Sequence, residues 1–318
     1  HLALSLFDLK GKEVILPSLS FVSTANAFAL RGATPVFIDI HEDTLNINET
    51  LIKSAITKKT KAIIPVHYAG VSCNMDFIMK LAHDESLIVI EDAAHSLGSE
   101  YNGKKVGTRG NFSAFSFHET KNIVSGEGGA LIINDSKFIE RAEIIREKGT
   151  NRTKFLKGEV DKYTWVDIGS SYLPSEIIAA FLYSQLENID KINLKRLQIY
   201  NQYKNKLNKL KDNGYISLSK IPSNCSHNSH MLYILTKNHK EQVSLLNSFK
   251  QNGVMAIFHY IPLHLSKAGK KYGRIGSSMD VTENIYGRLI RLPLYPDLTE
   301  NQVSFICSLI ENFYLELK

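Results

Sequence analysis

The chain has 318 residues, of which 43% are hydrophobic and 22% charged, and its formal net charge is +6. This composition is typical of an ordinary globular protein of about two domains. The positive charge is spread along the chain, without a nucleic-acid motif or a run of about 18 apolar residues, so we expect neither a nucleic-acid partner nor a membrane partner.

The beginning of the chain suggests that part of the protein is absent. His1 is followed by residues 2–9, an apolar run that is typical of the end of a helix. We therefore expect that a segment is missing before His1.

Apolar runs alternate with segments of helical spacing through the first third of the chain. We predict strands at residues 14–17, 36–40, 61–68 and 87–90, and helices at residues 18–29, 44–57 and 75–84. Such an alternation predicts an α/β fold with a mostly parallel sheet that is covered on both faces. Ligands of these sheets bind beyond the carboxyl ends of the strands, and Asp92 lies at such an end.

The segment from Phe115 to Gly129 carries the clearest chemical pattern. An apolar run ends at Ser116, Lys121 follows, and a glycine-rich turn leads to a predicted strand at 130–133. An arbitrary lysine is usually a solvated surface charge. Here, however, Ser116 offers a hydroxyl for an anion, and the glycines allow the backbone to approach a ligand closely. Together with the carboxylate of Asp92, these are the groups that a pyridoxal 5'-phosphate (PLP) site requires.

Each of these groups has a physical task at such a site. Lys121 must be neutral to attack the cofactor aldehyde, so its pKa must fall from about 10.4 toward 7 to 8, a cost of about 4 kcal/mol. Desolvation and a nearby positive charge can supply this shift. Asp92 is the candidate to keep the pyridine nitrogen protonated, which lets the ring accept electrons.

Patterns for other cofactors are weaker. Residues 98–105 nearly match the spacing of a P-loop, but Lys105 stands where a Ser or Thr must bind magnesium. No G-x-G-x-x-G pattern follows a predicted strand, which argues against a nicotinamide cofactor. The three cysteines have no metal-ligand or C-x-x-C spacing, so we predict no metal site and a reduced, cytoplasmic setting.

The pattern of predicted strands and helices changes in the second half of the chain, after a long helical region. We predict helices at 138–148, 174–187, 189–210, 241–252 and 299–314, and strands at 231–236 and 255–260. The polar stretch 149–171 is predicted to be a loop, and a loop of this length is usually functional. We therefore predict a large cofactor-binding domain over residues 1–205 and a small α+β domain over residues 206–318.

Several of these runs also resemble a known family. Residues 91–96, 116–122 and 127–130 resemble, in order and spacing, the DegT-like sugar-nucleotide aminotransferases, which have the aspartate-aminotransferase (type I PLP) fold. Within that family, residues 146–152, 161–165 and 167–172 are most similar to the dTDP-4-amino-4,6-dideoxygalactose transaminases. Ser171 and Leu173 stand where the family often has an Asn and an Arg.

The resemblance implies a function and roles for the candidate residues. It implies a PLP-dependent aminotransferase that converts dTDP-4-keto-6-deoxyglucose to dTDP-4-amino-4,6-dideoxygalactose, with glutamate as the amino donor. Lys121 would bond the cofactor and carry the proton, Asp92 would hold the pyridinium, and Ser116 the phosphate. Phe21 would stack on the pyridine ring and His95 would lie near the phenolic oxygen; the alternatives are a core phenylalanine and a satisfied core histidine.

The resemblance also implies substrate contacts and a partner. Lys148, Trp165, Tyr172 and His259 would contact the nucleotide sugar, with a structural role as the alternative for His259. Because sites of the family are completed across a two-fold interface, a homodimer with its site at the interface is implied.

Other functions remain open at this stage. The chain could aminate another nucleotide-linked keto sugar, or be an inactive cofactor- or ligand-binding homologue or fragment. The family's sugar dehydratases have a histidine in place of the lysine, so Lys121 argues against that activity.

Overall fold

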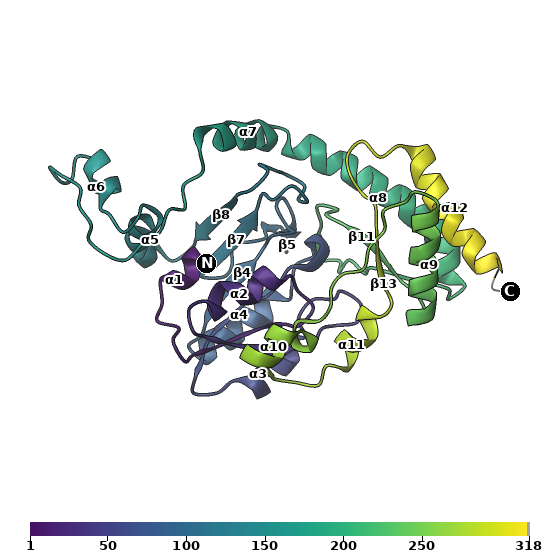
Figure 1. Ribbon diagram of the computed structural model, residues 1–318, viewed down its shortest axis with the longest axis horizontal. Coiled ribbons are helices and arrows are strands. Elements are labelled where there is room, and N and C mark those ends of the chain that lie inside the picture. The colour runs from purple at the N-terminus through teal and green to yellow at the C-terminus, as the bar shows by residue number, and fades with distance from the viewer. Residues whose placement is uncertain (317–318) are drawn as a thin grey trace.

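The computed structural model describes residues 1–316 and contains a central seven-stranded sheet (Figure 1). The strand order is β12-β2-β1-β3-β4-β7-β8. The strands are β1 (Glu13–Pro17), β2 (Thr34–Ile38), β3 (Thr60–Ile63), β4 (Ile88–Asp92), β7 (Phe112–Ser116), β8 (Gly129–Ile133) and β12 (Arg274–Ile275). Neighbouring strands are parallel except for β7 and β8, which pair antiparallel. The predicted α/β fold with a mostly parallel sheet is confirmed.

Successive residues of the central strands point to opposite faces of the sheet and fill a hydrophobic core on each face. Val14 and Leu16 belong to one core, while Ile15 between them belongs to the other. The first core includes side chains of α1 (Leu2–Ser5), α2 (Val22–Ala29) and α5 (Ile139–Arg146), and the second includes those of α3 (Ile52–Ala55) and α4 (Met75–Asp84). Burial on both faces explains why these strands are continuous apolar runs in the sequence.

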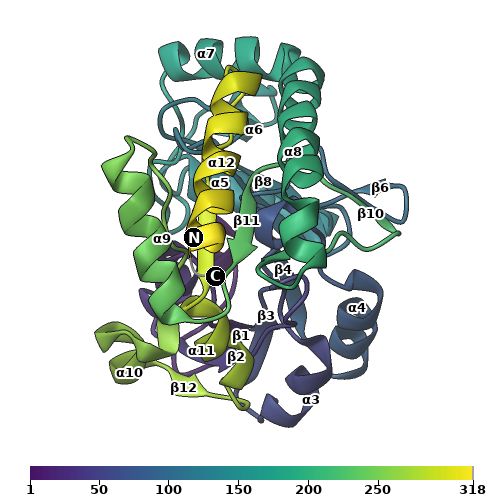
Figure 2. The same ribbon diagram turned by 90° about the vertical axis from the view of Figure 1, so that its right-hand side faces the viewer.

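The C-terminal part of the chain builds a second, smaller layer. A three-stranded antiparallel sheet contains β9 (Ser217–Leu218), β11 (Leu232–Leu235) and β13 (Leu289–Leu292), with β11 in the middle. The helices α8 (Ile189–Asp212), α9 (His239–Gln251) and α12 (Glu300–Glu316) run side by side over it (Figure 2). Their buried side chains, among them Tyr203, Leu245 and Val303, share one core with the strands.

The large and small layers are tied together by more than one crossing of the chain. The 24-residue helix α8 runs through the predicted domain boundary at residue 205. Later, β12 returns to the edge of the large sheet, where the Arg274 guanidinium donates to both carboxylate oxygens of Glu13 at 2.8 and 2.7 Å. The division at residue 205 therefore stays a prediction. No helix within residues 1–316, α8 included, combines the length and apolar character needed to cross a membrane.

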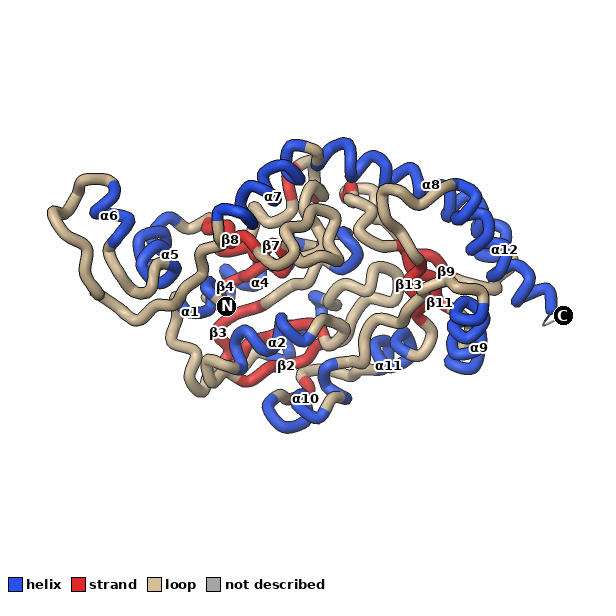
Figure 3. Tube along the Cα trace, turned by 45° about the horizontal axis from the view of Figure 1, so that its top comes forward, coloured by secondary structure: helices blue, strands red, loops and turns tan. Residues whose placement is uncertain are grey.

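Further strands and helices connect these elements. They are β5 (Glu100–Tyr101), β6 (Lys104–Lys105) and β10 (Cys225–Ser226), which form a small separate sheet, and the helices α6 (Arg152–Leu156), α7 (Glu176–Glu187), α10 (Lys267–Tyr272) and α11 (Asp280–Tyr286). The segment that contains α6 projects from the end of the molecule opposite to α12 (Figures 1 and 3). The predicted loop 149–171 thus holds one short helix.

Two predicted elements are wrong, and side-chain contacts account for the first. The helix expected at 44–57 is reduced to a 3-10 turn at Glu49–Leu51 and the four residues of α3. The side-chain amide of Asn46 donates to the carbonyls of Val71 and Ser72, and these contacts hold the beginning of the segment outside the helix. The strand expected at 255–260 keeps a single bridge, between Ile257 and Arg291.

A buried carboxylate fixes the loop that precedes β7. Glu91, in β4, is fully buried and accepts hydrogen bonds from the backbone amides of Gly107, Arg109 and Gly110, at 2.6 to 2.9 Å. His67, also fully buried, lies 2.9 Å from the same carboxylate. Burial alone would raise the pKa of Glu91, but the bonds from His67 and from the amides outweigh it and lower the pKa.

We expect Glu91→Gln to destabilise the fold by about 2 to 4 kcal/mol, because the new amide nitrogen would face backbone N–H donors. Since the folded pKa of Glu91 is lowered, its contribution to stability is present above the unfolded pKa and is lost as the pH falls below about 4. Urea unfolding between pH 3 and 7 measures both effects. Glu100→Gln is the control, because Glu100 is only partly buried and pairs with the exposed Lys105, so its loss should cost under about 1 kcal/mol. Equal losses in the two variants would contradict the prediction.

Candidate active site

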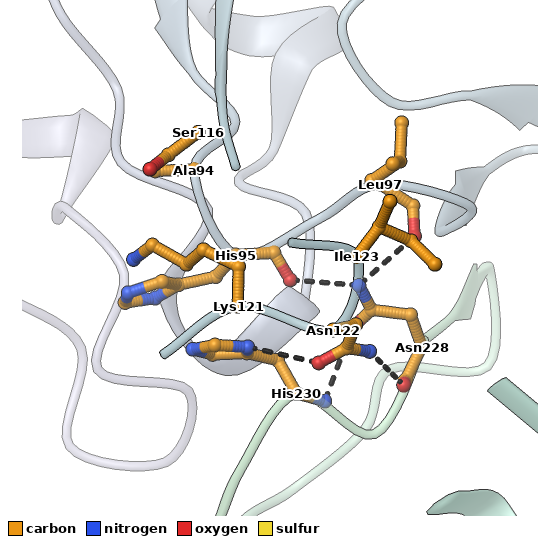
Figure 4. Close-up of a pocket in the computed structure, with 9 residues that line it drawn as sticks. All are labelled: Ala94, His95, Leu97, Ser116, Lys121, Asn122, Ile123, Asn228 and His230. Atoms are coloured by element: carbon orange, nitrogen blue, oxygen red, sulfur yellow. Dashed lines mark hydrogen bonds between the residues drawn. The ribbon is translucent and has the colours of Figure 1, made fainter. Parts of the chain in front are cut away.

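The candidate residues come together at the carboxyl edge of the central sheet. Asp92 ends β4 and Ser116 ends β7, and because these strands are parallel both residues lie at the same edge. Lys121 follows in the turn between β7 and β8. A pocket opens here, lined by Ala94, His95, Leu97, Ser116, Lys121, Asn122, Ile123, Asn228 and His230 (Figure 4). The last two come from the C-terminal part of the chain, more than a hundred residues away in the sequence.

The glycine-rich turn aims Lys121 into this pocket. The turn is closed by hydrogen bonds from the amides of Phe117 to Gly128 O at 2.9 Å and of Ser125 to Phe117 O at 2.7 Å. Gly128 has φ +155°, and a Cβ there would meet the Ser125 hydroxyl at 2.6 Å. A Cβ on Gly129 would meet the Phe115 carbonyl at 2.7 Å. Glycine is therefore required where the chain folds back against β7.

The surroundings of Lys121 lower its pKa. Burial is the largest cause, the positive charge of Arg291 adds to it, and the negative charge of Asp92 opposes it. A lower pKa means that more of the amine is neutral near pH 7. This is the direction that a nucleophilic lysine needs.

Asp92 is oriented by its neighbours. One carboxylate oxygen accepts from the Thr24 hydroxyl at 2.6 Å, and the other from the backbone amide of Ala94 at 3.1 Å. Thr24 lies in the first turn of α2 and also receives a hydrogen bond from the Ser20 hydroxyl at 3.1 Å. Thr24 is not among the site residues predicted from the sequence, in which its only signal is a hydroxyl residue near the start of the helix that follows β1.

Two neutral histidines form one wall of the pocket. The rings of His95 and His230 stack, with centroids 4.3 Å apart and an angle of 17° between their planes. Burial, aided by the positive charges of Lys121 and Arg291, lowers the pKa of both well below its usual value. His230 Nδ1 is paired with Asn122 Oδ1 at 3.1 Å, whereas His95 Nδ1 is buried without a partner.

A network of amides fixes the back of the pocket. Asn122, directly after Lys121, donates to the Asn193 side chain at 3.0 Å and to the Asn228 carbonyl at 2.8 Å. Asn228 in turn donates to the carbonyls of His95 and Leu97 at 2.9 and 3.0 Å (Figure 4). The network joins the turn of Lys121 to α8 and to the C-terminal part of the chain. Asn228 and His230 are not among the predicted site residues, because no local pattern in the sequence marks them.

The other predicted site residues do not line this pocket. Phe21 precedes α2 and is 56% exposed, with its ring 6.0 Å from that of Tyr260. His259 is buried, and its Nε2 lies 3.4 Å from the Arg291 guanidinium. Lys148 is exposed and Trp165 is 75% exposed, both in the projecting segment or at its base, while Tyr172 packs against His1. Their assigned roles stay predictions.

One feature of the pocket itself supports the binding of PLP. His95 Nδ1 is a buried polar atom without a partner, and such atoms are rare unless a ligand or water completes them. Lys121, Asp92, Ser116 and His95 are the residues that would hold the cofactor, which supplies an electron sink when bound. Within residues 1–316, no group of three or more His, Cys, Asp or Glu side chains could hold a metal ion.

The fold and this site define a type I PLP-dependent enzyme, and comparisons with known proteins agree. The model of the DegT/DnrJ/EryC1/StrS aminotransferase family matches residues 1–311, so the chain belongs to this family. It is a PLP-dependent aminotransferase, as expected from the sequence. The comparisons give no support to the expectation of a segment missing before His1.

Individual relatives cover nearly the whole chain. The GDP-perosamine synthase of Escherichia coli O157:H7 is 34% identical over 317 residues, which are 99% of this chain and 82% of that protein. The structure of Helicobacter pylori PseC, an aminotransferase involved in the biosynthesis of pseudoaminic acid, has a TM-score of 0.88 and 30% identity, covering 99% of this chain and 85% of PseC. A Streptococcus pneumoniae protein solved in its PLP form shares the fold, with a TM-score of 0.89 at 23% identity, covering 99% and 83% of the two chains.

We expect Lys121→Ala to lower transamination by about 10³-fold or more, because the variant loses both the nucleophile and the proton carrier. Borohydride treatment of the protein mixed with PLP, followed by peptide mapping, should fix the cofactor on the peptide of Lys121 in the natural chain and nowhere in the variant. Lys104→Ala, which removes an exposed lysine of β6, is the control and should behave like the natural chain. Cofactor fixed equally on the Lys121→Ala variant would contradict the assignment.

Proposed function

We propose that the protein transfers the amino group of glutamate to the 4-keto group of a nucleotide-linked 6-deoxyhexose. The observation that carries the proposal is Lys121, held largely out of water beside Asp92 at the carboxyl edge of the sheet. The names of relatives support the substrate class, since a GDP-perosamine synthase is 34% identical. The similarity of residues 146–152, 161–165 and 167–172 to one subgroup supports dTDP-4-keto-6-deoxyglucose as acceptor and dTDP-4-amino-4,6-dideoxygalactose as product.

The residues of the site have different roles in the two half-reactions. Lys121 accepts the proton from Cα of the amino donor and later returns a proton to C4 of the sugar, a task that its lowered pKa suits. Asp92, oriented by Thr24, supplies the fixed negative charge opposite a pyridinium nitrogen. His95 and His230 stay neutral, so they can form hydrogen bonds without adding charge beside Lys121.

We expect kcat/KM to depend on which nucleotide the acceptor sugar carries. With saturating glutamate, kcat/KM for the dTDP-linked 4-keto-6-deoxy sugar should exceed that for the GDP- and UDP-linked sugars by about tenfold or more, a difference of about 1.4 kcal/mol in transition-state binding. Product analysis by mass spectrometry for all three sugars measures this. A preference for the GDP- or UDP-linked sugar would leave the aminotransferase in place and overturn the choice of nucleotide.

The exposed apolar residues support a homodimer that completes the site. Ile177 and Tyr183 of α7 are 83% and 66% exposed, and Trp165 and Ile168 of the preceding loop are 75% and 77% exposed. Soluble monomers rarely expose so many neighbouring apolar side chains. We infer that a second copy covers this face, and that the projecting segment with Lys148 and Trp165 reaches the partner's pocket.

A charge placed on this face should separate the subunits. We expect Ile177→Glu combined with Phe181→Glu to halve the mass measured by light scattering during size-exclusion chromatography, because both side chains would carry unpaired charge into the interface. Phe305→Glu is the control, since Phe305 is 47% exposed on a different helix, α12, and should leave the mass unchanged. A natural chain that already has the mass of a monomer would contradict the interface.

A further inference from the structure

Ser18 and His264 form a buried hydrogen-bonded pair between two segments that are far apart in the sequence. They are 0% and 4% exposed, and Ser18 Oγ lies 2.6 Å from His264 Nδ1. The backbone takes part as well, because the amide of Leu263 donates to the Ser18 carbonyl at 2.9 Å and the amide of His264 donates to Ser18 Oγ at 3.2 Å. Three contacts thus join the residue after β1 to the segment before α10.

A carboxylate completes this pair. His264 Nε2 lies 3.1 Å from Oε1 of Glu283 in α11, whose side chain is 54% exposed. A carboxylate only accepts, so the ring holds a proton on Nε2, and in the neutral ring Nδ1 then accepts from the Ser18 hydroxyl. Serine, histidine and acid also form the triad of many hydrolases, but a substrate cannot reach the fully buried Ser18. These three residues therefore hold two segments together and do not attack a substrate.

The segment that begins at Ser18 leads to Asp92. The hydroxyl of Ser20, which is 2% exposed, donates to the Thr24 hydroxyl at 3.1 Å, and Thr24 donates to the Asp92 carboxylate at 2.6 Å. A displacement of Ser18 would therefore move the hydroxyl groups that orient this carboxylate.

The segment that ends at His264 lies beside the same carboxylate. The ring of Tyr260 is 6.0 Å from that of Phe21. Burial raises the pKa of Tyr260 to about 12, and the charge of Arg291 opposes this rise whereas that of Asp92 adds to it. The Tyr260 hydroxyl is thus within electrostatic reach of Asp92.

Few other backbone contacts hold this second segment. In the part of the chain that the structure describes, the amides of residues 258–261 donate no hydrogen bond. The backbone is fixed before them by the bridge between Ile257 and Arg291, and after them by the contacts with Ser18. Ser18 is therefore one of two anchors for the backbone that carries Tyr260.

We propose that the hydrogen-bonded set of Ser18, His264 and Glu283 positions the active site, although none of its members lines the pocket. The set holds the segment of Thr24 and the segment of Tyr260 in one arrangement. A displacement of about 1 Å that starts far from the reacting atoms can lower a rate by about a hundredfold. The inference depends on the aminotransferase family to which the chain belongs and not on the choice of sugar.

The binding of PLP tests the proposal without turnover. His264→Leu removes both ring nitrogens and should weaken PLP binding, measured by equilibrium dialysis, by about tenfold or more, and lower kcat with glutamate by at least as much. Ser18→Ala should act in the same direction. In His264→Asn the side-chain oxygen can accept from Ser18 in place of Nδ1, so this variant should recover both values to within about threefold of the natural chain.

A second histidine–glutamate pair provides the control. His41 Nε2 lies 2.7 Å from Glu49 Oε2, and neither residue lines the pocket. His41→Leu should lower the midpoint of thermal unfolding, as His264→Leu does, but leave PLP binding and kcat within about threefold of the natural values. In protein without added PLP, hydrogen exchange followed by mass spectrometry should be faster in residues 18–24 and 258–265 of His264→Leu and unchanged there in His41→Leu.

Each result decides between positioning and stability alone. If folded His264→Leu keeps PLP binding and kcat within about threefold of the natural values, the proposal is overturned, and equal losses in His264→Leu and His41→Leu overturn it as well. If His264→Leu does not fold, Ser18→Ala, which removes one oxygen atom, gives the same decision. A natural chain that binds PLP but does not react with glutamate would overturn the proposed amino donor instead, and PLP binding would still decide on the positioning.

Discussion

The site depends on keeping the amine of Lys121 out of water beside a carboxylate. Asp92 by itself would hold the amine as an ammonium ion, because opposite charges stabilise each other most strongly where water is excluded. Burial and the positive charge of Arg291 act in the other direction, and together they prevail. Burial is the largest of these influences, so the amine depends most on a pocket that excludes water. A more open pocket would leave Lys121 charged and unable to act as a nucleophile.

The dry pocket exists only because two distant parts of the chain are locked together. The carboxyl edge of the sheet supplies Asp92 and the turn of Lys121, and the segment around Asn228 covers the opposite side. The amides of Asn122 and Asn228 join the two parts, and Arg196 holds the carbonyls of the same segment from α8. Burial lowers the pKa of Arg196 to about 10, so it remains a cation at neutral pH and keeps these bonds. Polar groups buried in this way specify one arrangement, since each would be costly if left unpaired.

The exclusion of water also explains why the histidine rings around Lys121 are neutral. Three histidines, His95, His230 and His259, lie within reach of two cations, and burial keeps each of them uncharged. Charged rings would repel Lys121 and Arg291 and would compete for the anions of the substrates. The stacked pair of His95 and His230 therefore serves as a flat, polar wall rather than as a source of charge.

The sequence by itself determined the parts whose signals are local. Apolar runs buried on both faces predicted the parallel sheet, and the pattern from Asp92 through Ser116 and Lys121 to the glycine turn predicted the cofactor, because these residues follow strands that end at one edge. Local patterns gave a wrong prediction where a contact with a distant residue determines the backbone conformation. The side-chain amide of Asn46 donates to the carbonyls of residues 71 and 72, and most of the expected helix at 44–57 does not form. Only the tertiary structure brought His230 and Asn228 to the pocket of Lys121. Their roles depend on burial and on hydrogen bonds to residues 95–122, and neither exists until elements far apart in the sequence pack against one another.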